Sequence, residues 1–186
     1  MTKVKLFLFF LIGTVIFSLV GCGFHSQTIQ DIPPQLRTLY LDSPNPYSPL
    51  TVQLRRTLKS INVHITQTPQ TAPVTLRIIN NKMTANIPTI IYSGNATSYS
   101  YTLRTTFEIT KRNGEVIVGP KTLHISRSVL QNANQVYTPD ATDLLKRELT
   151  RSMVTLIYNQ ITALNTWKAL NKAFYRQGLN RHKHSV

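Results

Sequence analysis

The clearest alternation of apolar and polar residues lies near the middle of the chain. Tyr99, Tyr101, Leu103, Phe107 and Ile109 recur with a period of two, and serine, threonine and charged residues stand between most of them. A period of two places alternate side chains on opposite faces of a strand. This segment therefore predicts a strand with one buried face and one solvated face.

Two further long strands are expected on either side of this segment. Val74, Leu76 and Ile78 begin an alternation that predicts a long, bent strand to about Tyr92. The last strand is expected over residues 115–129, with a break at Gly119-Pro120 as one alternative. Turn residues separate the three segments, since Ser93-Gly94-Asn95 and Asn113-Gly114 are typical of tight turns and hairpins. We therefore expect an antiparallel meander.

Shorter elements precede the meander. Residues 36–42 and 63–67 predict two strands, and Ser48-Pro49 is a favourable start for a helix between them. That helix carries an apolar stripe of Leu50, Leu54, Leu58 and Ile61. Because a helix links them, the two strands are expected to be parallel or to be separated by another strand.

A second amphipathic helix should follow the meander. It is expected to begin at Thr138-Pro139-Asp140 and to carry apolar residues at helical spacing as far as Leu164. The basic tail should extend this helix to about Gln177 and be disordered after Gly178. Two amphipathic helices and one largely antiparallel sheet with a single buried face predict a two-layer α+β sandwich.

The N-terminus has the layout of an export signal. Two lysines precede an apolar run over residues 6–20, which is shorter than the roughly 20 residues that span a bilayer, although a short single-pass anchor is the alternative. The run ends in Leu19-Val20-Gly21-Cys22, which resembles the lipobox of bacterial lipoproteins. This resemblance implies cleavage before Cys22, a diacylglycerol on its thiol and an acyl chain on its new amino group. Gly23, in place of aspartate, then implies sorting to the outer membrane.

Four segments follow from these assignments. We expect a lipoprotein signal peptide over residues 1–21, a lipidated linker over 22–35, an α+β domain over 36–165 and a basic tail over 166–186. The mature chain keeps 19 Lys and Arg against 7 Asp and Glu, a net charge of +12. Such a charge favours an anionic partner, unless the source proteome is simply basic. Nucleic acid would be the default for a cytosolic chain, but an export signal favours phosphorylated lipid, above all lipopolysaccharide.

The order of several short motifs resembles the LptE family of lipopolysaccharide-assembly lipoproteins. These motifs are Cys22-Gly23-Phe24-His25, Ile32-Pro33, residues 39–43, Leu54-Arg55-Arg56, Ser93-Gly94, the Tyr99 strand and Ser126-Arg127-Ser128. The resemblance implies two helices on a four-stranded mixed sheet and a role without catalysis. It also implies one LptD-type outer-membrane β-barrel as partner, lipopolysaccharide as ligand, and a lipid-anchored position on the periplasmic face of the outer membrane.

Site residues can be carried over only in part. Family members tend to place basic residues around the hairpin before the Tyr99 strand, but here that tip, Tyr92, Ser93, Gly94 and Asn95, has no charge. We take the tip as a candidate barrel contact. The candidate lipopolysaccharide ligands by position are Arg77, Lys82, Arg104 and Arg127.

Two of these arginines have open alternatives. Arg104 lies on the solvated face of its strand, where it either pairs with an acid across the sheet or contacts a ligand. Arg127 shares the core-facing phase of Leu123, Ile125 and Val129, where it either snorkels past the sheet edge or contacts a phosphate or the barrel.

Catalytic chemistry has little support in the sequence. The seven carboxylates are scattered, the five histidines lack helical metal spacing, and no glycine-rich phosphate loop occurs. We expect no metal and no cofactor apart from the covalent lipid on Cys22. The alternative function is an outer-membrane lipoprotein of another class, acting as a barrel-assembly accessory or an envelope scaffold.

Overall fold

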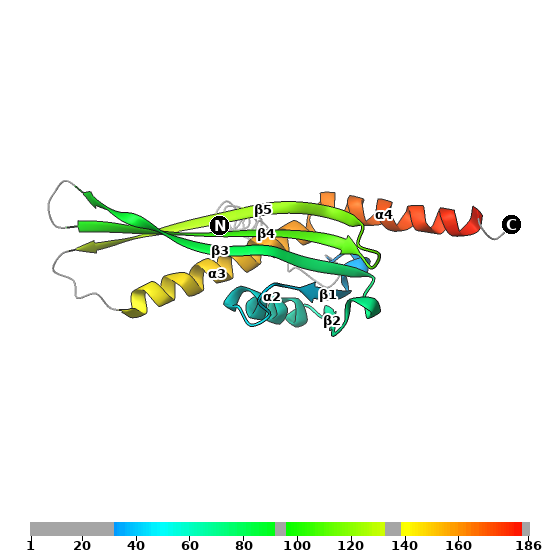
Figure 1. Cartoon of the computed structure of the whole chain (residues 1–186), viewed down its shortest axis with the longest axis horizontal. Coiled ribbons are helices and arrows are strands. Elements are labelled where there is room, and N and C mark those ends of the chain that lie inside the picture. The colour runs from blue at the N-terminus through cyan, green and yellow to red at the C-terminus, as the bar shows by residue number, and fades with distance from the viewer. Residues whose placement is uncertain (1–31, 92–95, 133–138, 184–186) are drawn as a thin grey trace, which may run out of the picture.

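A single mixed sheet runs through the molecule, and its strands lie in the order β2-β1-β3-β4-β5 (Figure 1). The computed structural model describes residues 32–91, 96–132 and 139–183. The strands are β1 (Thr38–Asp42), β2 (His64–Thr66), β3 (Val74–Ile91), β4 (Ala96–Lys111) and β5 (Val116–Asn132). The helices are α2 (Pro49–Ser60), α3 (Pro139–Thr162) and α4 (Leu164–Lys183), with short 3-10 turns η2 (Pro34–Leu36) and η3 (Pro69–Thr71).

The α+β class is confirmed, but the sheet has five strands where four were expected. All five segments predicted as strands are present, so only the count of four implied by the family resemblance is wrong; β2 pairs with β1 through three residues. β1 runs parallel to both β2 and β3, while β3, β4 and β5 form the antiparallel meander. The helix between β1 and β2 thus makes them parallel neighbours, one of the two arrangements that the sequence left open.

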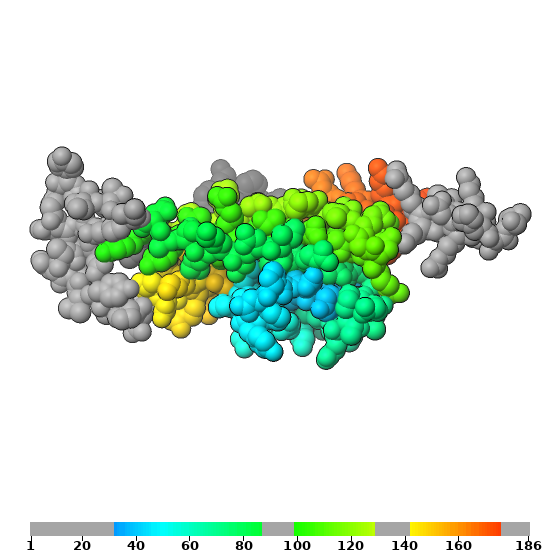
Figure 2. Space-filling view, viewed as in Figure 1, coloured from blue at the N-terminus to red at the C-terminus, as the bar shows by residue number. Residues whose placement is uncertain are grey.

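One face of the sheet carries the core. Ser48 caps α2 by accepting a hydrogen bond from the Thr51 amide at 3.2 Å, and this helix buries Leu50, Leu54 and Leu58. Leu149, Met153 and Ile157 of α3 are also fully buried, and they join the same apolar cluster as the inward residues of β1, β3 and β4. Figure 2 shows that β1, α2 and β2 occupy only part of the length over which the long strands extend.

The second helix predicted from the sequence is two helices in the structure. α3 ends at Thr162 and α4 begins at Leu164, with the Thr166 and Trp167 amides both donating to the Ala163 carbonyl. Thr166 also donates its hydroxyl to the carbonyl of Gln160 at 2.7 Å, which stabilises the break. α4 continues past Gly178 to Lys183, so residues 179–183 of the segment expected to be disordered are helical. No helix in the described ranges combines the length and apolar character needed to span a bilayer.

Register shifts decide which side chains face the helices. Between Ile78 and Asn80 the pairing of β3 with β4 skips one residue, Ile79. The β3 residues that face the helices are therefore even-numbered up to Ile78 and odd-numbered at Met83. β5 skips one residue in the same way around Gly119 and Pro120. The skip places Leu123 inside with Val118, although the two are five positions apart. Without these bulges, strict alternation would turn the parts of β3 and β5 beyond them inside out.

Gly119 is required at its bulge for two reasons. Its φ of 102° lies in a region that residues with a side chain rarely adopt. A Cβ at this position would lie 2.9 Å from the Phe107 carbonyl oxygen and 3.0 Å from the Glu108 Cα, both of them backbone atoms. The neighbouring strand therefore leaves no room for a side chain here.

Gly119→Ala is expected to lower the free energy of unfolding by about 2–3 kcal/mol, because strain and a backbone clash act together. Urea denaturation measures the loss. Gly114→Ala is the matched control, since Gly114 also has a positive φ of 84° but open space around it, and it should lose only about 1 kcal/mol. Equal losses in the two variants would show that the close approach at Gly119 is unimportant.

Candidate functional site

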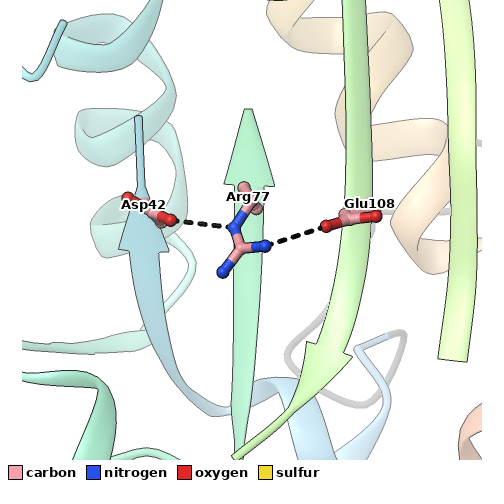
Figure 3. Close-up of polar contacts among 3 residues, drawn as sticks. All are labelled: Asp42, Arg77 and Glu108. Carbon is pink, nitrogen blue, oxygen red and sulfur yellow. Dashed lines mark hydrogen bonds and ion pairs between the residues drawn. The ribbon is translucent and has the colours of Figure 1, made fainter. Parts of the chain in front are cut away.

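Arg77 lies at the centre of an ion-paired triad across three strands. Its Nε donates to Asp42 Oδ2 at 2.9 Å and its Nη1 donates to Glu108 Oε1 at 3.2 Å (Figure 3). The residues are direct neighbours in register, on β1, β3 and β4. The guanidinium thus joins the parallel and antiparallel parts of the sheet.

The triad leaves Arg77 with no spare positive charge. The hydrogen bond to Asp42 is the main cause that raises the pKa of Arg77 above its ordinary value, and the charges of Asp42 and Glu108 add to it against partial burial. Two carboxylates face one guanidinium, so the local charge is negative. Arg77 is therefore a structural cation rather than a ready ligand for phosphate.

Lys82, Arg104 and His124 form a second, different group, which we call the cationic row. Lys82 on β3 pairs in register with Arg104 on β4, and Arg104 pairs with His124 on β5. All three residues are exposed on the open face of the sheet, opposite the helices. Among the described residues none of them forms an ion pair, so the alternative in which Arg104 pairs with an acid across the sheet is not met.

Like charges directly opposite each other on neighbouring strands destabilise a sheet. Lys82 and Arg104 nevertheless occupy such positions, and an imidazole stands on the far side. Adjacent strands lie about 4.8 Å apart, so the row spans about 10 Å. A multivalent anion across these side chains would relieve the repulsion, which makes the row the best candidate for an anion site.

Hydroxyl groups flank the cationic row on both sides. Thr102 and Ser126 are hydrogen-bonded at 2.7 Å, and Thr106 and Thr122 at 2.9 Å, each pair bridging β4 and β5. These cross-strand bonds fix the strands at the row and keep the surface around it polar. Sugar hydroxyls or a polar protein wall could replace water on such a surface.

Arg127 lies apart from the cationic row, on the side of the sheet that faces α3. Its Nε is 3.9 Å from Glu148 Oε1 of α3, and the Arg127 side chain is 48% exposed. The core-facing phase expected from the sequence is therefore present, with the head group reaching past the packed layer to solvent. The structure brings together Lys82 and Arg104 among the four candidates, and it separates Arg77 and Arg127 from them.

His124 is the member of the row that the sequence reading missed. Thr122, His124 and Ser126 are two positions apart and so share one face of the strand, but only the register between β4 and β5 places His124 beside Arg104. The remaining candidates, Cys22 for lipidation and Tyr92, Ser93, Gly94 and Asn95 for barrel contact, lie outside the described residues.

A second polar feature is a groove of about 380 Å³ at the carboxyl ends of β1 and β2. Arg55 and Lys59 of α2 form one wall, and Tyr40 and Asp42 belong to the other side. Asp42 is already engaged by Arg77, so the groove has a weak positive character. In the described part of the chain no group of His, Cys, Asp and Glu side chains could hold a metal ion.

The fold is that of small bacterial lipoprotein domains. It superposes on a minor lipoprotein from Acinetobacter baumannii with a TM-score of 0.57 at 24% identity, covering 68% of this chain and 91% of the other. It also superposes on the rare lipoprotein B from Shewanella oneidensis with a TM-score of 0.55 at 23% identity, covering 67% and 92%.

Within this class the chain can be assigned to a family. The model of the LptE family, described as lipopolysaccharide-assembly, matches residues 36–161, more than half of the chain. The LPS-assembly lipoprotein LptE of Pectobacterium atrosepticum is 27% identical over 157 residues, 83% of this chain and 84% of the relative. The chain belongs to the LptE family, as its motifs indicated.

Arg77→Met is expected to lower the free energy of unfolding by about 1–2 kcal/mol in urea, because Asp42 and a largely buried Glu108 would face each other without a cation. Adding Glu108→Gln should recover part of that loss. Arg104→Met is the contrasting variant, and its stability should stay the same or rise slightly since a like-charge contact disappears. An equal loss for Arg104→Met would contradict the distinction between the two arginines.

Proposed function

We propose that this LptE-family chain plugs and supports an LptD-type outer-membrane β-barrel, one copy each, and assists the assembly of lipopolysaccharide at the outer leaflet. In this proposal the cationic row binds lipopolysaccharide. The observation that carries it is the row itself, a set of basic side chains held side by side on the open face of an LptE domain and without an ion pair to any described residue.

The chemistry of the row suits a phosphorylated lipid. Lys and Arg form charge-assisted hydrogen bonds with phosphate oxygens, and the planar guanidinium of Arg104 can donate two at once. Lys82 contributes a second, more flexible positive charge at the neighbouring position. Lipid A phosphates and inner-core acids are the anions that we propose for this site.

The membrane position follows from the N-terminal motif. We propose that Cys22 carries a diacylglycerol and an N-acyl chain, which anchor the protein to the periplasmic face of the outer membrane. One acyl chain alone gives only marginal attachment, so a triacylated cysteine supplies a stable anchor. The role is one of binding and placement, and the proposal includes no catalytic step.

Barrel contact is proposed for the hairpin tip, Tyr92, Ser93, Gly94 and Asn95. β3 and β4 bring the two sides of this tip together as the ends of the longest ladder in the sheet. Residues 83–103 include no charged side chain, so this end of the hairpin can enter a barrel lumen without burying unpaired charge.

Lys82→Glu/Arg104→Glu is expected to weaken binding of purified protein to lipopolysaccharide by about tenfold or more at low salt, and less at high salt, because added salt screens the lost attraction. Fluorescence titration with labelled lipopolysaccharide measures this. The matched control Arg56→Glu/Lys59→Glu makes the same change in net charge on α2 and should have an effect of less than about threefold. Equal weakening in both variants would show that the loss of binding comes from the change in net charge and not from the cationic row.

Arg127→Glu tests which face of the sheet binds lipopolysaccharide. Because Arg127 lies on the α3 side, this variant should bind lipopolysaccharide within about twofold of the unaltered protein. A loss as large as that of the Lys82→Glu/Arg104→Glu variant would move the site to the helical side.

A photoreactive amino acid at Ser93 tests the barrel contact in cells. We expect an adduct with a large β-barrel protein, and no such adduct from the control position Ser60 at the exposed end of α2. An adduct with a different envelope protein, without any with a large barrel, would instead favour a barrel-assembly accessory or an envelope scaffold.

A further inference from the structure

α4 lies beyond the part of the chain that the family model matches. The match ends at residue 161, and α4 covers Leu164–Lys183. Five of its residues are lysine or arginine and none is aspartate or glutamate, the five being Lys168, Lys172, Arg176, Arg181 and Lys183. A helix with this composition needs an explanation that the shared domain does not provide.

One side of α4 attaches it to the body of the protein. Leu170 is completely buried and Phe174 is partly buried against the core. Gln35 of η2 donates its side-chain amide to Asn171 Oδ1 at 3.1 Å, so the start of the described chain contacts the middle of this helix. Figure 1 shows α4 continuing past the end of the sheet. The helix is thus held in place by one side, while another side is exposed.

The exposed side carries both cations and large apolar groups. At 100° per residue, Leu164, Lys168, Lys172 and Tyr175 fall within about 80° of one another, roughly opposite Leu170. We call these four residues the outward face of α4. Leu164 is 77% exposed and Tyr175 is 74% exposed, and both lysines are exposed as well. Among described residues neither lysine forms an ion pair.

Interleaved basic and apolar side chains on one helix side are typical of attachment to a membrane surface. The ammonium groups lie at the head groups while the apolar parts enter the interface. A purely acidic protein partner would explain the lysines but would leave Leu164 and Tyr175 without a role. The mixture therefore favours an anionic lipid surface.

The distance to the expected anchor permits this contact. Gln35, which touches α4, lies 13 positions after Cys22. Thirteen residues span at most about 45 Å when fully extended, so a lipid on Cys22 would keep α4 within that distance of the bilayer. A helix so close to the membrane needs only weak attraction to stay on it.

We propose that the outward face of α4 binds the surface of a bilayer containing anionic phospholipid. This second attachment would fix the orientation of the domain, which a flexible lipid anchor alone would leave free. The inference goes beyond the proposed function and uses it only for the position of the anchor.

The test uses residues 22–186 with Cys22→Ser, so that no acyl chain contributes. Flotation with phosphatidylcholine vesicles that contain phosphatidylglycerol should recover the protein, whereas pure phosphatidylcholine vesicles should not. Lys168→Glu/Lys172→Glu should weaken binding by about tenfold or more, since each basic residue near an anionic surface adds to the attraction. Arg147→Glu/Arg151→Glu, with the same spacing and exposure on α3, is the matched control and should change binding by less than about threefold.

Tryptophan fluorescence distinguishes insertion of this face into the membrane from general charge attraction. Trp167 is the single tryptophan of the chain, so Trp167→Phe/Tyr175→Trp moves the only indole to the outward face. Its emission should shift to shorter wavelength when phosphatidylglycerol vesicles are added and not with neutral vesicles. Circular dichroism confirms that all variants keep their helical content.

Several outcomes would overturn the proposal. They are unchanged binding after the α4 charge reversal, equal losses in the α3 control, the absence of an emission shift, and binding to lipopolysaccharide micelles but not to phospholipid vesicles. The Lys82→Glu/Arg104→Glu variant should bind phospholipid vesicles within about threefold of the unaltered chain. Failure of the α4 proposal and failure of the lipopolysaccharide site can thus be told apart.

Discussion

The rest of the structure depends on one constraint, namely which of the alternating side chains of the three long strands face the helices. The described helices cover one face of the sheet, so the core side chains must point to that face along strands of 16 to 18 residues. A strict period of two cannot do this for the sequence as it stands, and the skipped residues near Ile79 and Gly119 restore the phase. The same skips place Lys82 and His124 on the open face. The core and the candidate site are therefore set by one geometric adjustment.

The open face uses its cations in two ways. Arg77 is neutralised by Asp42 and Glu108 and holds three strands together, while Arg104 has Lys82 and His124 as cross-strand neighbours and forms no ion pair with a described residue. In the first arrangement the protein supplies the counter-charge from its own side chains, and in the second it does not. The charge of the whole chain says nothing about this difference, which depends on which residues stand opposite each other. An excess of basic residues becomes a binding surface only where the sheet leaves them unpaired.

Much of the domain could be predicted from local pattern. The alternation around Tyr99, the Asn113-Gly114 turn and the stripe from Leu50 to Leu58 each specify an element through neighbours a few positions apart. All five strands, the three-residue β2 included, were predicted as segments, and only the count of four strands implied by the family resemblance was too low. The break at Ala163 was missed because the apolar spacing continues through it, and the hydrogen bond from Thr166 to Gln160 that stabilises it joins residues across the break.

By itself the sequence determined the class of the fold, its family, the excess positive charge and the expected lipid anchor at Cys22, because these depend on composition, short motifs and periodicity. Only the tertiary structure decided which basic residues stand together. It joined Lys82, Arg104 and His124, which lie 22 and 20 positions apart, and it placed Arg77 between two acids and Arg127 on the far side. It also placed Asn171 of α4 against Gln35. The physical reason is that register and bulges are settled by packing against the helices and by contacts between distant strands, and no short stretch of sequence carries that information.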